Sequence, residues 1–245
     1  MRPFWIALAF LTRLPAPAPV AVAPTPVEMG RSILYFPLVG LLLGVIVAAV
    51  AWMFSGLAPA LAAALVLACA IALTGVLHLD GLADSADAWV GGHGDVDRTL
   101  EIMKDPRSGA AGVAALIVAL LVHYSALQVI VEQRLWGALI VAPVAGRAAA
   151  AALFLTTPYV RRQGLGAALA QFLPRRALVW MLLLSAIVIA AIAAGRAWAV
   201  LAVAAGVFWL GRRAMVRRIG GTTGDTAGAM VVGVECAALV VMAWG

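Results

Sequence analysis

Charged residues and cysteines are both scarce in this sequence. Only 11% of its 245 residues are Asp, Glu, Lys or Arg, and 65% are hydrophobic, whereas a soluble domain typically carries about 25% charged residues. Together with a mean hydropathy of +1.07, this balance excludes an ordinary soluble protein and predicts an integral membrane protein. The two cysteines, Cys69 and Cys236, lie inside separate apolar runs, so we expect neither a disulfide nor a cysteine metal motif.

Lysine is scarcer still, because Lys104 is the single lysine among 17 basic residues. The arginines are spread over separate segments and form no single basic face, so nucleic acid is not expected as a partner. The sequence also shows no second domain and no long linker. We therefore predict one membrane-embedded domain over residues 1–245.

The chain consists mainly of long apolar runs. A membrane-spanning helix needs about 20 predominantly apolar residues, and uniform runs of that length support only a helical bundle. We predict an all-α, polytopic membrane protein with about seven spans, within a range of six to eight. The expected spans are residues 33–54, 58–79, 110–131, 135–157, 177–194, 197–211 and 228–244. The fifth and sixth are short and could instead form one bent hairpin around Gly195 and Arg196.

The N-terminal segment has the basic start, apolar stretch and small residues of a secretory signal peptide. Against that interpretation, Thr12 and Arg13 end the apolar run and a proline-rich segment follows. We favour a short helix that lies in or dips into the membrane interface.

The basic residues predict the orientation. With the N-terminus inside, the cytoplasmic segments hold 14 of the 17 basic residues, while the opposite face keeps only Arg134 and Arg196, and Arg147 falls within the fourth span. Cytoplasmic loops of membrane proteins carry such an excess of arginine and lysine. We expect a multi-pass protein of the lipid bilayer whose N-terminus and charged loops lie in the cytoplasm.

Seven of the eleven acidic residues lie between Asp80 and Asp105. On a helix, Asp80, Asp84 and Asp87 fall within an arc of about 60° on one face. Three carboxylates so close repel one another, and a divalent cation relieves the repulsion. Oxygen ligands suit Mg²⁺ or Mn²⁺ better than zinc, so we predict a metal site on these three residues. The alternative is a solvated helix end with scattered acids.

The segment LEIMKDPRSGAAG, residues 100–112, places Lys104, Asp105 and Arg107 before two glycines and the next expected span. Cations beside a glycine-containing helix entrance can hold phosphate, although such residues often only anchor a helix at the membrane surface. A metal ion beside cationic side chains can stabilise the charge that develops when a nucleophile displaces a leaving group at a phosphate or diphosphate.

The segment GGTTGDTAGA, residues 220–229, precedes the last expected span. Thr222 and Thr223 offer hydroxyl groups, and Asp225 could complete the metal shell or orient a nucleophile. The alternative is that Thr223 or Asp225 caps the final helix, and both interpretations can hold together.

Two charges fall inside expected spans, Arg147 in the fourth and Glu235 in the seventh. Both should face the bundle interior, because exposing a charge to lipid is expensive. They could pair with each other, or Arg147 could reach a substrate phosphate. For His123 we expect a hydrogen-bonded packing role.

These segments, taken together and in order, resemble one family. They are FLTRLPAP (10–17), FPLVGLLLG (36–44), HLDGLADSADAW (78–89), LEIMKDPRSGAAG (100–112), APVAGR (142–147), PYVRRQGLG (158–166) and GGTTGDTAGA (220–229). The chain resembles the cobalamin synthase family, the adenosylcobinamide-GDP ribazoletransferases of bacterial vitamin B12 assembly. HLDGLAD followed by EIMKD is the most specific part. Pro106 and Ser108 depart from the family's pattern and leave the shape of that loop open.

The resemblance implies a Mg²⁺-dependent transferase of the bacterial inner membrane that completes nucleotide loop assembly. It would join adenosylcobinamide-GDP to α-ribazole or its 5′-phosphate, giving adenosylcobalamin or its phosphate plus GMP. It leaves open a homo-oligomer or an association with other B12 assembly enzymes. Asp80, Asp84 and Asp87 would hold Mg²⁺, with Asp84, Lys104, Asp105 and Asp225 as catalytic residues. The expected substrate-binding residues are Arg13, His78, Arg107, Arg147, Thr222 and Thr223.

Three other classes of protein remain as alternatives. A CDP-alcohol phosphotransferase should show a D-G-x-x-A-R pattern, but Ser85 stands at the arginine position. An aromatic prenyltransferase should carry two separate aspartate-rich helices, and here there is one together with the lone Asp225. A transporter is disfavoured because the acids gather at the expected cytoplasmic edge and few ionisable groups reach mid-membrane.

Overall fold

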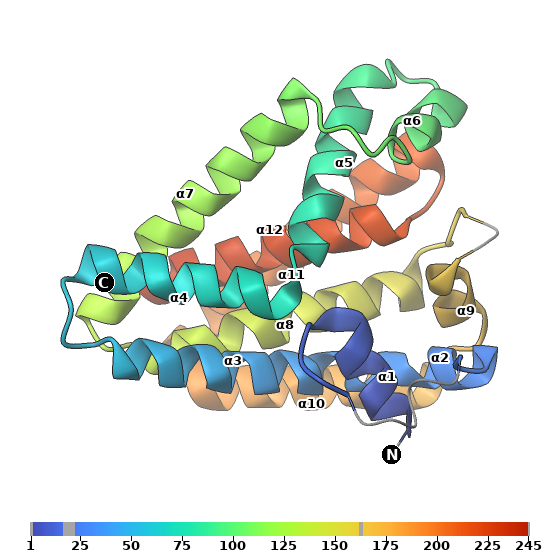
Figure 1. Cartoon of the computed structure of the whole chain (residues 1–245). Helices are drawn as coiled ribbons and strands as arrows, with labels where there is room; N and C mark the ends of the chain where they lie inside the picture. The colour runs from blue at the N-terminus through green and yellow to red at the C-terminus, as the bar shows by residue number, and fades with distance from the viewer. Residues whose placement is uncertain (1, 17–22, 162–163, 245) are drawn as a thin grey trace.

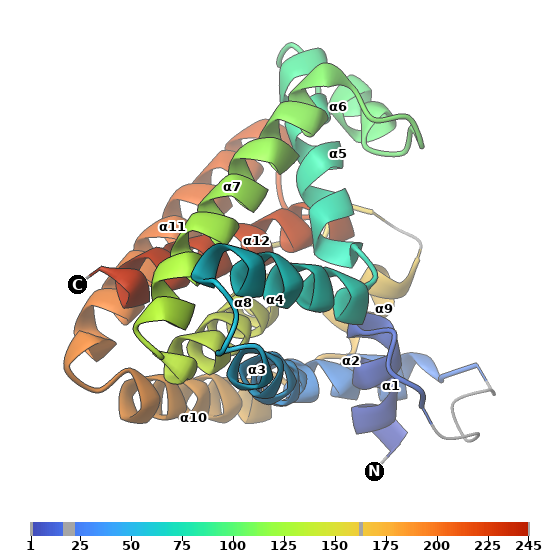
Figure 2. The same ribbon diagram turned by 60° about the vertical axis from the view of Figure 1, so that its left-hand side comes forward.

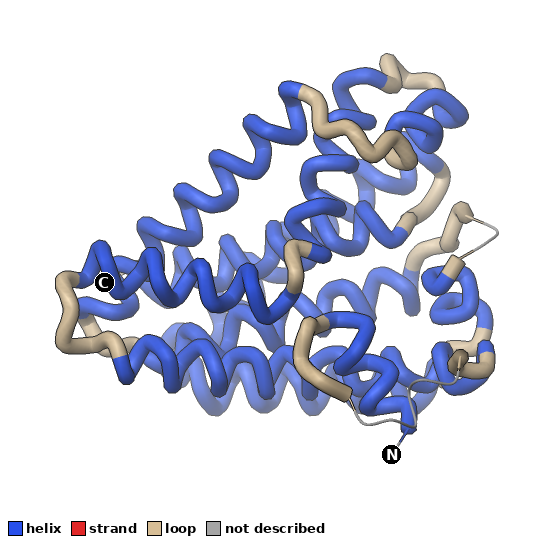
Figure 3. The backbone as a smooth tube through the Cα atoms, in the orientation of Figure 1, coloured by secondary structure: helices blue, strands red, loops and turns tan. Residues whose placement is uncertain are grey.

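The computed structural model describes residues 2–16, 23–161 and 164–244. All regular structure in this part of the chain is helical, and Figure 3 shows helices joined by short loops. The helices are α1 (Arg2–Leu11), α2 (Pro26–Ser32), α3 (Phe36–Met53), α4 (Pro59–Thr74), α5 (Leu77–Gly91), α6 (Val96–Ile102), α7 (Ala110–Glu132), α8 (Trp136–Thr156), α9 (Leu165–Gln171), α10 (Arg175–Ala193), α11 (Ala197–Ile219) and α12 (Gly224–Ala243), with 3₁₀ turns η2 (Ile33–Tyr35) and η3 (Ala194–Arg196). The prediction of an all-α, polytopic membrane protein is confirmed.

Five stretches of the described chain are long and apolar enough to cross a membrane, and the bent pair α4–α5 makes a sixth. One of the five, Arg175–Ile219, has 45 residues. It consists of α10 and α11, which η3 joins at a sharp turn and which run from there in different directions (Figure 2). Counting α10 and α11 separately gives seven spans, within the predicted range.

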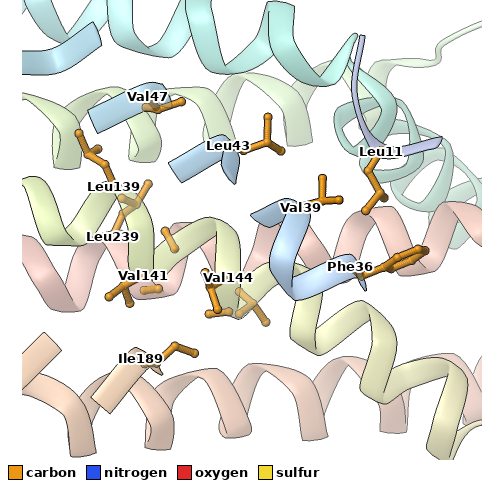
Figure 4. Close-up of a cluster of buried hydrophobic side chains, with 14 of the residues drawn as sticks. Leu11, Phe36, Val39, Leu43, Val47, Leu139, Val141, Val144, Ile189 and Leu239 are labelled. Carbon is orange, nitrogen blue, oxygen red and sulfur yellow. The ribbon is translucent and has the colours of Figure 1, made fainter. Parts of the chain in front are cut away.

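The core is centred on α3, α8 and α12. Gly40 and Gly44 of α3 lie against the backbone of α8, and a Cβ atom on Gly44 would stand 2.6 Å from the Cα atom of Ile140. Small residues four apart allow this close approach between membrane helices. Around the contact, Leu43 and Val47 pack near Leu139 in the cluster of buried side chains that Figure 4 shows.

The span expected at 58–79 extends too far at its end, because α4 ends at Thr74. Gly75 and Val76 both adopt left-handed backbone conformations, with φ of 58° and 59°, and the chain turns by 87° between α4 and α5. Glycine commonly ends a helix in this way, whereas hydropathy carries no information about it. The acidic motif therefore lies on a separate helix that rises from the end of α4 (Figure 1).

The span expected at 197–211 is too short, because α11 continues to Ile219. Four arginines therefore lie on its last turns rather than in a loop. Arg212 donates to the Thr157 hydroxyl (3.0 Å) and the Thr156 carbonyl (2.8 Å), and the Arg213 guanidinium lies 5.3 Å from the centre of the Trp209 ring. Long arginine side chains can carry their charge to the membrane surface while the helix remains in the apolar layer.

The two ends of the bundle differ in charge. One end carries α1, α2, α6 and α9, and the other carries the turns after α3, α7 and α10 together with the end of α12 (Figure 1). Of the described basic residues, only Arg134 and Arg196 belong to the second end. The most exposed tryptophans there are Trp52, Trp198 and Trp244, which is typical of side chains at a membrane–water interface.

Candidate active site

The candidate site forms where α5 packs against the first turn of α12, and two glycines allow the contact. A Cβ atom on Gly81 of α5 would lie 2.6 Å from the backbone carbonyl oxygen of Asp225, and one on Gly228 of α12 would lie 3.3 Å from the Cα atom of His78. The absence of side chains at these positions lets the helix backbones meet. The junction therefore brings residues far apart in the sequence to one place.

Three carboxylates from two helices share this junction. The charges that act on Asp84 come from Asp80, then Asp225 and, more weakly, Asp87, and the positive charge of Arg161 opposes them. The sequence predicted a group of Asp80, Asp84 and Asp87 on one helix face. The structure adds Asp225 of α12, whose backbone lies against Gly81, three residues before Asp84.

Asp87 has a different set of partners from the one expected. Its two carboxylate oxygens accept hydrogen bonds from the backbone N–H groups of Gly109 (2.6 Å) and Gly112 (2.8 Å). These N–H groups belong to the start of α7, where they have no partner within the helix. Asp87 of α5 thus caps α7, and the positive N-terminal end of α7 stabilises the Asp87 carboxylate. A role for Asp87 as a metal ligand stays a prediction.

Arg161 is the residue that the sequence reasoning missed. One of its terminal nitrogens lies 2.7 Å from a carboxylate oxygen of Asp225, and the same nitrogen is 3.5 Å from the Met103 carbonyl oxygen. The segment before it is held by two backbone hydrogen bonds, from Val160 to Thr222 (3.0 Å) and from Thr222 to Pro158 (2.8 Å). The motif PYVRRQGLG contained the residue, but no spacing in the sequence indicated this contact.

Thr222 and Thr223 are completely buried. The Thr223 hydroxyl accepts from the backbone N–H of Thr226 (3.2 Å), and the Thr226 hydroxyl accepts from that of Thr223 (2.8 Å), which is a reciprocal cap of α12. The capping alternative is therefore confirmed. A direct role for either threonine in substrate binding stays a prediction.

Lys104, Asp105 and Arg107 lie in the loop between α6 and α7. Arg107 donates through Nη2 and Nε to Asp105, at 2.7 Å and 2.9 Å. These hydrogen bonds lower the pKa of the Asp105 carboxyl to about 2. The loop reaches the junction through Met103, which contacts both Arg161 and Thr223. Lys104 itself is exposed.

The remaining predicted residues lie deeper or further along the chain. Arg147 pairs with Glu235 inside the bundle, which is one of the two alternatives that the sequence left open, and a role for Arg147 in substrate binding stays a prediction. His78 is buried on the first turn of α5. Arg13 donates its backbone N–H to the Leu73 carbonyl (2.8 Å), and its side chain covers Gly75 at the break between α4 and α5.

The donor atoms at the junction are those that Mg²⁺ prefers, namely carboxylate oxygens from Asp80, Asp84 and Asp225. Among the described residues, no three Asp, Glu, His or Cys side chains are already arranged as a ligand set. A complete protein cage is not needed, because Mg²⁺ is commonly held by one or two carboxylates, water and substrate phosphates. The residues therefore fit such an ion in their chemistry.

Known proteins match the chain over nearly its whole length. The profile of a family described as cobalamin-5-phosphate synthase matches residues 3–243. An adenosylcobinamide-GDP ribazoletransferase of Pseudomonas entomophila is 54% identical over 244 residues, covering 99% of both chains. A protein of the same name from Stutzerimonas stutzeri is 55% identical over 99% of this chain and 98% of its own, and one from Pseudomonas putida is 51% identical over both whole chains. No solved structure matches.

Proposed function

The chain belongs to the cobalamin-5-phosphate synthase family, and on that premise we propose that it carries out the reaction for which its relatives are named. It would join adenosylcobinamide-GDP to α-ribazole or its 5′-phosphate and release GMP. The structural observation that supports this most directly is the junction of α5 and α12. There, Asp225 of α12 pairs with Arg161, and the charges of both act on Asp84 of α5.

In the reaction a ribose hydroxyl oxygen attacks the diphosphate phosphorus that is attached to the corrinoid side chain. A new oxygen–phosphorus bond forms, and the bond from that phosphorus to the bridging oxygen breaks. GMP leaves with the bonding electron pair, and the hydroxyl proton passes to a base. We assign this base to Asp84 or Asp225, because both lie at the junction and a positioned carboxylate can accept such a proton.

The proposed cofactor is Mg²⁺, held by Asp80 together with whichever of Asp84 and Asp225 does not act as the base. When bound, it would supply positive charge to the diphosphate. Asp87 is less suited to bind Mg²⁺, because its carboxylate already accepts two backbone hydrogen bonds. Asp105 is also a weaker candidate for the base, because its pKa of about 2 leaves it little affinity for a proton.

Cationic side chains would neutralise the charge that develops on GMP. Lys104 lies on the loop that contacts the junction, and Arg107 could join it on releasing Asp105. A guanidinium binds phosphate in a bidentate manner, whereas an ammonium acts as a point charge. Arg13, at the break between α4 and α5, is a further candidate for a phosphate contact.

The charge distribution supports placement in the bacterial cytoplasmic membrane, with the junction facing the cytoplasm. The end of the bundle that holds the junction also holds nearly all the described basic residues, as the cytoplasmic face of a membrane protein does. Both substrates would then reach the site from the compartment in which nucleotides are made. Association with a second copy or with other B12 assembly enzymes stays a prediction.

GMP release by the purified protein in detergent tests the proposed function. We expect release that requires both adenosylcobinamide-GDP and α-ribazole or its phosphate, stops with EDTA and returns with Mg²⁺. Asp84→Asn should abolish it, while Asp97→Asn, an exposed aspartate of α6, should not. A folded protein that releases no GMP would contradict the proposal. It would bring forward another diphosphate transferase or, if reconstituted vesicles show solute flux, a transporter.

A further inference from the structure

A cavity of about 90 Å³ lies within the bundle. Its walls come from α3, α4, α5, α7, α8 and α12, and its lining is mainly leucine, valine and alanine. Four side chains bring nitrogen or charged oxygen atoms to this apolar lining, namely His78, His123, Arg147 and Glu235. Ligand sites in proteins typically combine apolar walls with a few placed polar groups in this way.

Two of these polar side chains have nitrogen atoms without a partner. Arg147 and His78 are 2% and 7% exposed, and neither Nε of Arg147 nor Nε2 of His78 has a hydrogen-bond partner within the described chain. A buried polar group left unsatisfied costs about 1–3 kcal/mol, and native proteins contain few of them. A ligand that offers an acceptor atom to the Arg147 N–H group would satisfy it.

The charges of the cavity limit the class of ligand. Arg147 pairs with Glu235, so the two charges cancel, and an anionic phosphate would add an uncompensated charge within the membrane layer. A pure hydrocarbon would leave the Arg147 and His78 nitrogens unsatisfied. The best match is a neutral, mostly apolar ring system that carries one acceptor nitrogen. The volume of about 90 Å³ is far too small for a corrin macrocycle, and it takes only part of a two-ring base, so the rest of such a molecule lies outside the cavity.

The cavity adjoins the candidate active site. His78 lines it and lies two residues before Asp80, on the first turn of α5 and in contact with Gly228 of α12. Thr74 and Leu79 line the same side, around the break between α4 and α5. Figure 1 shows this break beside the first half of α12. A molecule placed partly in the cavity could therefore extend past His78 to the carboxylates of the junction.

We propose that this cavity receives one end of the aromatic base of the nucleoside acceptor. The benzimidazole base of α-ribazole is neutral and apolar, and one ring nitrogen remains free to accept a hydrogen bond from Arg147. The ribose then lies beside His78, with its attacking hydroxyl toward Asp80 and Asp84. The inference rests on the proposed function for the identity of the acceptor. It assigns the deep apolar part of the site to the base and the polar junction to the diphosphate.

Filling the cavity tests the assignment. Ala70 of α4 and Ala142 of α8 line it, so Ala70→Leu or Ala142→Leu should displace part of the base. We expect the KM for α-ribazole to rise at least tenfold, while the KM for adenosylcobinamide-GDP changes less than twofold. Ala186→Leu is the matched control, because Ala186 is a half-buried alanine on the outer surface of α10, away from the cavity.

An acceptor with a smaller base makes the test specific. The acceptor for this test is the riboside of unsubstituted benzimidazole, which lacks the two ring methyl groups of α-ribazole. In Ala70→Leu, its KM should be much lower than the KM for α-ribazole, whereas in wild type the two KM values should be similar. The assignment would be overturned if the KM rose equally for both acceptors, or if the KM for α-ribazole were unchanged in both filled variants. Size-exclusion profiles and melting temperatures identify a variant that has simply misfolded, and the second filled variant then carries the test.

Calorimetric titration with the free base, 5,6-dimethylbenzimidazole, separates this inference from the proposed function. Saturable binding to wild type and to Ala186→Leu, lost in the filled variants, supports the cavity even if no GMP is released. GMP release by wild type without any effect of filling would leave the proposed function intact and refute the cavity assignment.

Discussion

A Cβ atom added to Gly81 on α5 would lie 2.6 Å from the backbone carbonyl oxygen of Asp225 on α12. No real Cβ contact is so short, so the two helices can meet in this way only because residue 81 is glycine. The contact brings Asp225 within the electrostatic range of Asp84. A single missing side chain on α5 thus determines whether carboxylates from two helices form one group.

Gly81→Ala should separate α5 from α12. The obstructing atoms belong to backbone and cannot rotate away, so we expect a loss of about 1–3 kcal/mol in stability, as in other overpacked sites, and a loss of GMP release of at least tenfold. Gly206→Ala is the control, because a Cβ atom there would meet no other atom within 4 Å. Melting temperature and initial rate measure the two effects. Full activity in Gly81→Ala would show that the close contact is not needed.

Asp87 and Asp84 lie one turn apart on α5, but their variants should behave differently. Asp87→Ala removes the cap of α7, which should cost about 0.5–2 kcal/mol as for other helix caps. The Mg²⁺ concentration for half-maximal activity should stay within about twofold of wild type, whereas Asp84→Asn should abolish activity at every Mg²⁺ concentration. Titrating Mg²⁺ at saturating substrates gives the comparison. A large increase in the Mg²⁺ requirement of Asp87→Ala would restore Asp87 as a metal ligand.

Asp105 should not set the pH dependence of the reaction. Hydrogen bonds from Arg107 lower its pKa to about 2, so its carboxylate is ionised across the working range and loses its charge only as the pH falls toward 2. The acid limb of the pH–rate profile should therefore keep its midpoint in Asp105→Asn. We would measure kcat from pH 5 to 9 in both proteins. A shift of that midpoint by one pH unit would identify Asp105 as the proton acceptor after all.

The helical membrane architecture, the placement of basic residues and the inward position of Arg147 and Glu235 could all be predicted, because they follow from the energy of placing side chains in an apolar layer. The cap by Thr223 was also predictable, since Thr226 lies within the same turn. Each of these features depends on composition or on residues close together in the sequence.

The features that could not be predicted depend on distant contacts or on backbone angles. Asp87 caps a helix that begins 23 residues later, and Arg161 reaches Asp225 because the chain beside it pairs with Thr222. The turn at Gly75 and Val76 lies inside an apolar run that looks continuous. Spacing on one helix therefore placed Asp80 and Asp84 on one face, and the sequence named Asp225 as a candidate, but it could not show the contact between Asp225 and Arg161.

Arg161 offers the sharpest test of whether the junction binds a cation. Its guanidinium hydrogen-bonds to Asp225 and opposes the charges of the three carboxylates, so Arg161→Ala should leave them repelling one another. We expect the variant to lose about 1–3 kcal/mol of stability in EDTA, because an acceptor at the junction loses its charged donor. Arg98→Ala, at an exposed position on α6, should lose much less.

Millimolar Mg²⁺ should then raise the melting temperature of Arg161→Ala more than that of wild type, because an ion that binds only the folded state stabilises it and the uncompensated carboxylates bind it more tightly. Thermal denaturation in EDTA and in Mg²⁺, followed by intrinsic tryptophan fluorescence, makes the measurement without substrate. If Mg²⁺ stabilises wild type, Arg161→Ala and Arg98→Ala equally, the carboxylates of the junction do not form the cation site. The Mg²⁺ proposal would then have to rest on ligands supplied by the diphosphate alone.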